Sequence, residues 1–115
     1  MKVILSRKGF DSQYGGVSSP ILPDGRIISL PIPSDNDRFS YRNLKLDDQT
    51  YYDKMHELGI KNEILEKKCH LDPDIYKNVI KREPEWKPLF GQRGTAQGHL
   101  NNQGVESGDI FLFFG

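Results

Sequence analysis

The stretch Gly108-Asp109-Ile110-Phe111-Leu112-Phe113-Phe114 decides the fold. Five large apolar residues follow a Gly-Asp turn, and their β propensity predicts a strand over 110–114. A strand this apolar is prone to aggregate unless it is paired and covered. Near the start of the sequence, Lys2-Val3-Ile4-Leu5-Ser6 reads as a second buried strand. We therefore expect 110–114 to lie centrally in a sheet, beside the strand of Val3–Leu5.

The region from about Ser40 to Glu83 is predicted to be mostly helical. Thr50 and Asp53 form the pattern of a capping box, in which a hydroxyl acceptor precedes an acid by three residues. The residues that follow place apolar side chains at helical spacing and then a glycine stop: Tyr51, Met55, Leu58 and Gly59. A second helix is predicted from Asp72-Pro73, which suit a helix start, to Pro84, which ends it.

Two further elements follow from turn chemistry. Pro23-Asp24-Gly25-Arg26 predicts the turn of a hairpin that joins Ile21-Leu22 to 27–30. A short helix is predicted over Thr95–Gln103, with Gly104 as its left-handed cap. Together the elements predict an α+β fold in a single domain over residues 1–115, with a small mixed or antiparallel sheet and helices packed on one side. A PUA-like barrel is the alternative, because such barrels also have Gly-Asp turns that lead into apolar strands.

The composition limits the classes of function. The 115 residues include 16 basic and 16 acidic side chains, so the formal net charge is zero. Proteins held on DNA mainly by phosphate neutralisation usually carry a basic excess, so any nucleic-acid contact must come from a local patch. No apolar run approaches the roughly 20 residues that span a bilayer, so no membrane partner is expected. Cys69 is the single cysteine, which excludes a disulfide scaffold and makes a cytoplasmic protein the simplest interpretation.

The first candidate group follows the predicted N-terminal strand: Arg7, Lys8, Asp11 and Ser12. Side chains at the end of a core strand are held rigidly beside a crevice, where ligands often bind. Arg7 and Lys8 could hold a phosphate, and Asp11 could act as a base or bind a sugar hydroxyl. The alternative is a charged loop in which an Arg–Asp pair fixes a turn.

The second candidate group is His70, Asp72 and Asp74. A histidine and two carboxylates within five residues could serve as an acid–base pair. In the alternative, Asp72 caps the predicted helix, Asp74 favours its positive end, and His70 is a buried polar residue near its start. A metal site has the weakest support, because the spacing is not a zinc pattern and Cys69 does not complete one.

The third candidate group lies in the glycine-rich segment 90–100. Gln92, Gln97 and His99 are neutral polar groups that could hold a sugar or the edge of a base. The segment is not a Walker loop, because the Gly-Lys-Ser/Thr ending is absent. The alternative is a tight turn capped by polar side chains.

The chain resembles the nucleotide modification associated domain 3 family. The resemblance rests on blocks that occur in order along nearly the whole sequence: Ser6–Ser12, Gly15-Gly16, Pro20–Gly25, Leu30–Pro33, His70–Asp74, Phe90–Gln92, Ala96-Gln97, His99-Leu100, Gln103–Val105 and Gly108–Gly115. It implies a domain associated with modified nucleotides or DNA bases in phage and bacterial systems. Family members extend past the Phe-Phe-Gly block, which leaves open that this sequence is the N-terminal portion of the domain.

The resemblance implies that the polar groups share one cavity, which handles a nucleotide or nucleic acid. In that interpretation Arg7, Lys8 and Ser12 contact the nucleotide, and Gln92 and Gln97 orient its base or sugar. Proton transfer falls to a histidine and a carboxylate from this set: His70, His99, Asp11, Asp72 and Asp74. Two alternatives stay open, a non-catalytic PUA-like reader of modified DNA or RNA and a small interaction protein. The residues identify no cofactor, oligomeric state or reaction.

Overall fold

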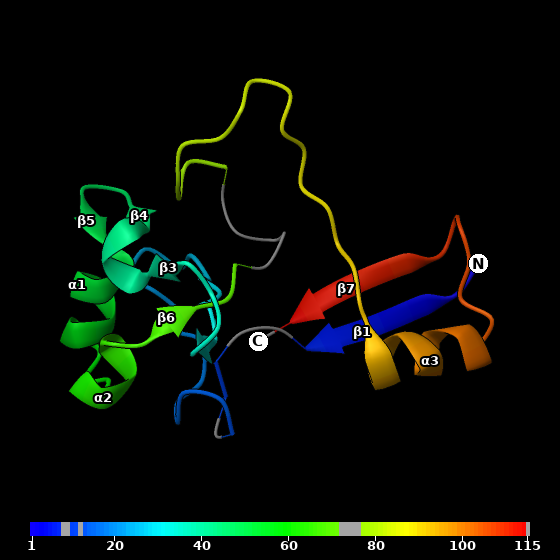
Figure 1. The fold of residues 1–115 in the computed structure, drawn as a ribbon, viewed down its shortest axis with the longest axis horizontal. Coiled ribbons are helices and arrows are strands. Elements are labelled where there is room, and N and C mark those ends of the chain that lie inside the picture. The colour runs from blue at the N-terminus through cyan, green and yellow to red at the C-terminus, as the bar shows by residue number, and fades with distance from the viewer. Residues whose placement is uncertain (8–9, 12, 72–76, 115) are drawn as a thin grey trace.

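The computed structural model describes residues 1–7, 10–11, 13–71 and 77–114. Figure 1 shows two parts, one made of β1, β7 and α3 and the other of the remaining helices and strands. The segment between Val79 and α3 arches from the second part to the first. The described chain forms several small sheets and a few short helices, which confirms the α+β class. Among the described strands no sheet closes into a barrel, so the PUA-like alternative loses its structural basis.

The strands β1 (Val3–Arg7) and β7 (Ile110–Phe114) pair in parallel over their full lengths, as the sequence predicts. Asp109 closes the start of the pair, since its Oδ1 accepts the N–H of Lys2 at 2.7 Å. The expected burial is wrong, because Val3 is 55% exposed and Leu5 is 70% exposed. The expected central position is also wrong, because in the described chain this sheet has two strands and each is an edge.

The helix α3 (Gly94–Asn102) lies beside β1 and confirms the predicted helix within one residue at each end. Its end is also as predicted. Gly104 has φ +62°, and the N–H of Val105 donates to the carbonyl of Leu100 at 3.1 Å. Ahead of the helix, Phe90 packs its ring 4.9 Å from the rings of both Phe111 and Phe113. These contacts fix the loop before α3 against β7.

The helix α1 (Tyr51–Glu57) confirms the predicted capping box. Thr50 Oγ1 accepts the N–H of Asp53 at 3.1 Å, and Asp53 Oδ2 accepts the N–H of Thr50 at 3.0 Å. Tyr51 and Met55 are buried, and Gly59 ends the helix at φ +77°. Local signals therefore place this helix correctly.

The rest of the middle region is less helical than predicted. It contains these short elements: the 3₁₀ helix η1 (Tyr41–Asn43), α2 (Asn62–Leu65), and the strands β3 (Phe39–Ser40), β4 (Lys45–Leu46), β5 (Gln49–Thr50) and β6 (Lys68–Cys69). With β2 (Pro33–Ser34), β6 and β3 make an antiparallel sheet in the order β2-β6-β3, and β4 pairs with β5. The helix predicted to end at Pro84 is wrong over 77–83. There the carbonyl of Val79 accepts the N–H of Lys45 at 2.8 Å, a long-range bond rather than a helical one.

The hydrophobic core lies within the part of the chain from Phe10 to Val79. Its members are Phe10, Leu22, Ile28, Leu30, Tyr41, Leu44, Leu46, Tyr51, Met55, Ile60, Leu65, Cys69 and Val79. Tyr41 satisfies its buried hydroxyl by donating to the carbonyl of Pro31 at 2.7 Å. The β1–β7 sheet and α3 contribute no residue to this core.

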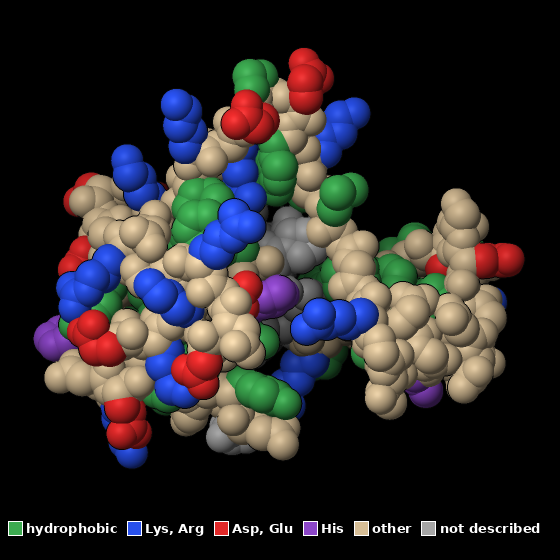
Figure 2. Space-filling model, viewed as in Figure 1, with side chains coloured by type: hydrophobic (Ala, Val, Ile, Leu, Met, Phe, Trp, Pro, Cys, Tyr) green, Lys and Arg blue, Asp and Glu red, His purple; other side chains and the backbone are tan. Residues whose placement is uncertain are grey.

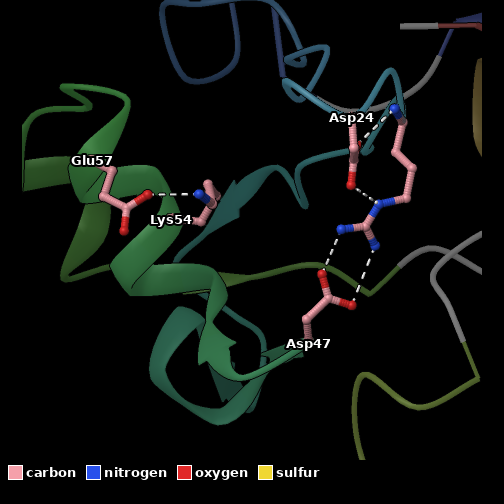
Figure 3. A network of polar contacts seen from close by, with 5 residues as sticks. Asp24, Asp47, Lys54 and Glu57 are labelled. Atoms are coloured by element: carbon pink, nitrogen blue, oxygen red, sulfur yellow. Dashed lines mark hydrogen bonds and ion pairs between the residues drawn. The ribbon is translucent and has the colours of Figure 1, made fainter.

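The predicted hairpin is reduced to a turn with a single bridge between Ile21 and Ile27. The turn is nonetheless stabilised by hydrogen bonds from the Arg26 side chain. Its guanidinium donates from Nε to Asp24 at 2.8 Å and from Nη2 to Asp47 at 2.6 Å. Figure 3 shows how the three side chains join this turn to the one between β4 and β5. The network is exposed, so it contributes more to local order than to the free energy of unfolding.

Candidate functional site

A hollow of about 930 Å³ receives side chains from segments that are far apart in the sequence. Arg7 comes from the end of β1, and Asp11 from the loop after it. His70 comes from the end of β6, and Gln92 and Arg93 from the loop before α3. In Figure 2, basic side chains lie across the middle of this face of the molecule. Three motif groups that the sequence predicts to share one cavity therefore each place a residue there.

Asp11 is committed to a turn. Its Oδ1 accepts the N–H groups of Gln13 and Tyr14, both at 2.7 Å, and its Oδ2 lies 3.8 Å from Arg7 Nε. The hydrogen bond from the Tyr14 N–H, together with that from Gln13 and the charge of Arg7, holds the pKa of Asp11 below its usual value. These contacts match the alternative interpretation of the first candidate group, in which Arg7 and Asp11 form a pair that fixes a turn. They suit Asp11 to positioning Arg7 rather than to accepting a proton.

His70 is paired with Asp37. The backbone N–H of His70 donates to the carbonyl of Ile32 at 3.0 Å, which holds the residue where β6 meets the segment before β2. Its Nδ1 lies 3.3 Å from both carboxylate oxygens of Asp37. The hydrogen bond from the Ser34 side chain holds the pKa of Asp37 below its usual value, with smaller contributions from His70 and Arg93. A carboxylate that accepts from Nδ1–H fixes the tautomer of a neutral imidazole.

Gln92 and Arg93 approach the hollow from the loop before α3. Arg93 is close enough to Asp37 for its charge to lower the pKa of that carboxyl group. Within the described ranges the Arg93 guanidinium makes no hydrogen bond and no ion pair, and neither does the amide of Gln92. Both side chains therefore have donors available to a bound molecule.

The other predicted residues fall into two sets. Gln97 and His99 lie on α3 and do not line the hollow. The Gln97 amide donates to Asn101 Oδ1 at 2.8 Å, while His99 lines a separate groove of about 440 Å³ along β1 that Gln92 also touches. The second set lies outside the described residues and comprises Lys8, Ser12, Asp72 and Asp74.

Sequence reasoning missed Ser34, Asn36, Asp37 and Arg93, which all line the hollow. The polar run Ser34-Asp35-Asn36-Asp37 after a proline carries turn chemistry, and that was its one available signal. The partnership of Asp37 with His70 spans 33 residues and depends on the β2-β6-β3 sheet. No local pattern predicts such a pairing.

The described side chains contain no group of three or more His, Cys, Asp or Glu residues placed to hold a metal ion. In the same part of the chain, no helix has the length and apolar character that crossing a bilayer requires. The functional groups that line the hollow are guanidinium, imidazole, carboxylate and amide groups. Guanidinium groups bind phosphate in a fork, and an imidazole beside a carboxylate can move a proton.

The comparisons with known proteins point to one family. A model of the nucleotide modification associated domain 3 family matches residues 2–115, which is nearly all of the chain. No curated protein and no solved structure is significantly similar to the chain. The family is named for an association with nucleotide modification. This match confirms the resemblance seen in the sequence, and the chain belongs to the nucleotide modification associated domain 3 family.

Proposed function

We propose that the hollow beside His70 binds a nucleotide and supports proton transfer on it. The observation that carries this proposal is the meeting of Arg7, His70 and Gln92, from three separated segments, with Asp37 and Arg93 around one hollow. Its volume of about 930 Å³ is within the usual range of small-molecule sites, roughly 300–1,000 Å³. The family's name supports a nucleotide as the class of ligand.

Arg7 and Arg93 are the proposed phosphate contacts. The 3.8 Å separation of Arg7 Nε from Asp11 exceeds hydrogen-bond distance, so the guanidinium keeps its donors for a ligand. Arg93 has no ion pair within the part of the chain that the structure describes. Two guanidinium groups on one hollow favour an anion with several acceptor oxygens, such as a phosphate.

His70 is the proposed proton acceptor or donor, and Asp37 orients it. Nδ1–H donation to Asp37 directs the basic lone pair to Nε2, which is the arrangement of a general base. Gln92 supplies a donor and an acceptor for a base or sugar. Lys8, Ser12, Asp72 and Asp74 stay proposed contributors, since each is close in sequence to a residue that lines the hollow.

The test is calorimetry with a panel of mononucleotides, NAD and a nucleotide sugar. We expect at least one to bind, and the variant Arg7→Ala/Arg93→Ala to weaken that binding by at least roughly 10-fold. The matched control, Lys61→Ala/Lys68→Ala, removes two positive charges that do not line the hollow and should bind as the unaltered protein does. Absence of heat from every nucleotide would overturn the proposal. If the arginine variant and the control bound with equal affinity, the nucleotide would bind at a site other than this hollow.

A further inference from the structure

We propose that a second surface, separate from the nucleotide hollow, binds the phosphate backbone of a nucleic acid. We call it the basic patch, and its members are Lys45, Lys77, Lys81 and Arg82. They line a hollow of about 650 Å³ in which Glu83 is the one acidic side chain among the described residues. In Figure 2, basic side chains are prominent in the upper part of the same face. The chain as a whole has a formal net charge of zero, so this excess of basic side chains is local to the patch.

Among the residues that the structure describes, no acidic side chain forms an ion pair with the four cations of the basic patch. Elsewhere in the chain, basic side chains pair with acids, as Arg42 does with Glu66 at 2.8 Å and Lys54 with Glu57 at 2.6 Å. Over the described ranges, no ion pair involves any member of the patch. Like charges gathered without counter-charges repel, and a bound polyanion would remove that repulsion while releasing counterions.

Arg82 adds a second, independent observation. Its Nε is buried and has no hydrogen-bond partner within the described part of the chain. An unsatisfied buried donor costs free energy, roughly 1–3 kcal/mol, unless a ligand or water accepts from it. The guanidinium of Arg82 also lies 4.1 Å from the ring centroid of Trp86. A guanidinium that stacks on a ring contacts it with its face, so its in-plane N–H groups can still donate to an anion.

The basic patch is held in place by the core. Val79, between Lys77 and Lys81, is 1% exposed, and its carbonyl accepts the N–H of Lys45 at 2.8 Å. The patch therefore has a fixed backbone beneath flexible lysine heads. Such a frame suits a repeating polyanion better than a single small anion, since four cations can meet successive phosphates.

A nucleic acid fits this surface better than an acidic protein segment does. Asn43, Asn78 and Phe39 also line the hollow. Amides donate to phosphate and sugar oxygens, and aromatic rings stack with bases. The patch shares no residue with the nucleotide hollow, so its role does not depend on the proposed function.

The experiment measures fluorescence anisotropy of a short labelled single-stranded DNA of mixed sequence, and of its duplex, over a salt series. With four phosphate contacts, we expect affinity to fall roughly 50- to 150-fold between about 50 and about 200 mM salt. Lys77→Ala/Lys81→Ala should reduce the salt slope by about 1.4–1.8. Both lysines are exposed, so the variant should fold. Lys61→Ala/Lys68→Ala serves as the matched control and should keep the slope of the unaltered protein.

Mononucleotide binding separates this proposal from the proposed function. Lys77→Ala/Lys81→Ala should keep mononucleotide affinity while losing oligonucleotide affinity, and Arg7→Ala/Arg93→Ala should do the reverse. An unchanged salt slope in Lys77→Ala/Lys81→Ala overturns the basic patch, whatever the hollow binds. Equal competition by polyglutamate of matched charge also overturns it, because the surface would then respond to charge alone.

Discussion

His70 Nδ1 lies 3.3 Å from both carboxylate oxygens of Asp37, although the two residues are 33 positions apart. The carboxylate therefore determines which ring nitrogen carries the proton when the imidazole is neutral. In Asp37→Ala we expect the proton to leave Nδ1, and nitrogen chemical shifts of the His70 ring would record the change of tautomer. Removing a negative charge that faces Arg93 should also strengthen nucleotide binding severalfold at low salt. Ring shifts identical to those of the unaltered protein would contradict the orienting role of Asp37.

Gln92 and Gln97 provide a second prediction, because the structure places them differently. Gln92 lines the hollow, whereas the Gln97 amide is bonded to Asn101 on α3. Gln92→Ala should weaken nucleotide binding by roughly 3- to 10-fold, the loss expected for a single neutral hydrogen bond. Gln97→Ala should leave binding unchanged in the same calorimetric titration. Equal losses in both variants would instead indicate a site that extends over α3.

Gly15 and Phe10 provide a prediction about stability. Gly15 has φ +112°, and a Cβ added there would lie 2.1 Å from Phe10 Cδ1. Phe10 is a buried core residue, so its ring cannot move away freely. Gly15→Ala should lower the free energy of unfolding by about 2–4 kcal/mol. The new Cβ would overlap the Phe10 ring, and alanine would also have to adopt a positive φ. Urea denaturation would measure it.

Gly16→Ala is the control for that substitution. Gly16 also has a positive φ, +86°, but no atom of the described residues beyond its chain neighbours lies within 4 Å of the added Cβ. Its cost should therefore be limited to the backbone, about 1 kcal/mol. If the two variants were equally stable, the contact with Phe10 would not be the cause.

Asp109 predicts how the β1–β7 sheet responds to pH. The hydrogen bond from the Lys2 N–H, followed by that from the Glu106 N–H, holds the pKa of Asp109 below its usual value. A carboxyl group whose pKa is lower in the folded state stabilises the protein above its unfolded pKa, about 3.9. That stabilisation is lost as the pH falls through the lower, folded value. Asp109→Asn should therefore melt at a lower temperature than the unaltered protein near neutral pH, and the difference should shrink in acid. A constant difference across pH would exclude the ionised carboxylate as its source.

The elements that the sequence predicts correctly are those with local causes. The Thr50–Asp53 capping box, the Gly104 cap of α3 and the apolar run of β7 each carry their signal within a few residues. The pairing of β1 with β7 was also predictable, because both runs are apolar and each needs a partner. Of the residues that line the hollow, the sequence singles out Arg7, Asp11, His70 and Gln92, because these four lie in motif blocks.

The elements that the sequence predicts wrongly have long-range causes. Residues 77–83 were expected to be helical, but Val79 is held by Lys45 across the core. Asp37 was missed because its turn comes next to His70 only when β2 and β3 both pair with β6. Val3 and Leu5 were predicted to be buried but are exposed, because an apolar run predicts a strand without showing whether another element packs over it.

The parallel pairing of β1 with β7 makes the order of assembly matter for function. Contacts within the core from Phe10 to Val79 close shorter loops of the chain. The contact between Val3 and Ile110 instead closes a loop that contains nearly the whole chain, so it has the larger entropic cost. Arg7 is the last residue of β1 and lines the hollow, so we expect the β1–β7 pairing to hold its guanidinium there. Amide hydrogen exchange should accordingly find that β1 opens before the core does, so the proposed phosphate contact of Arg7 should be lost before the core unfolds.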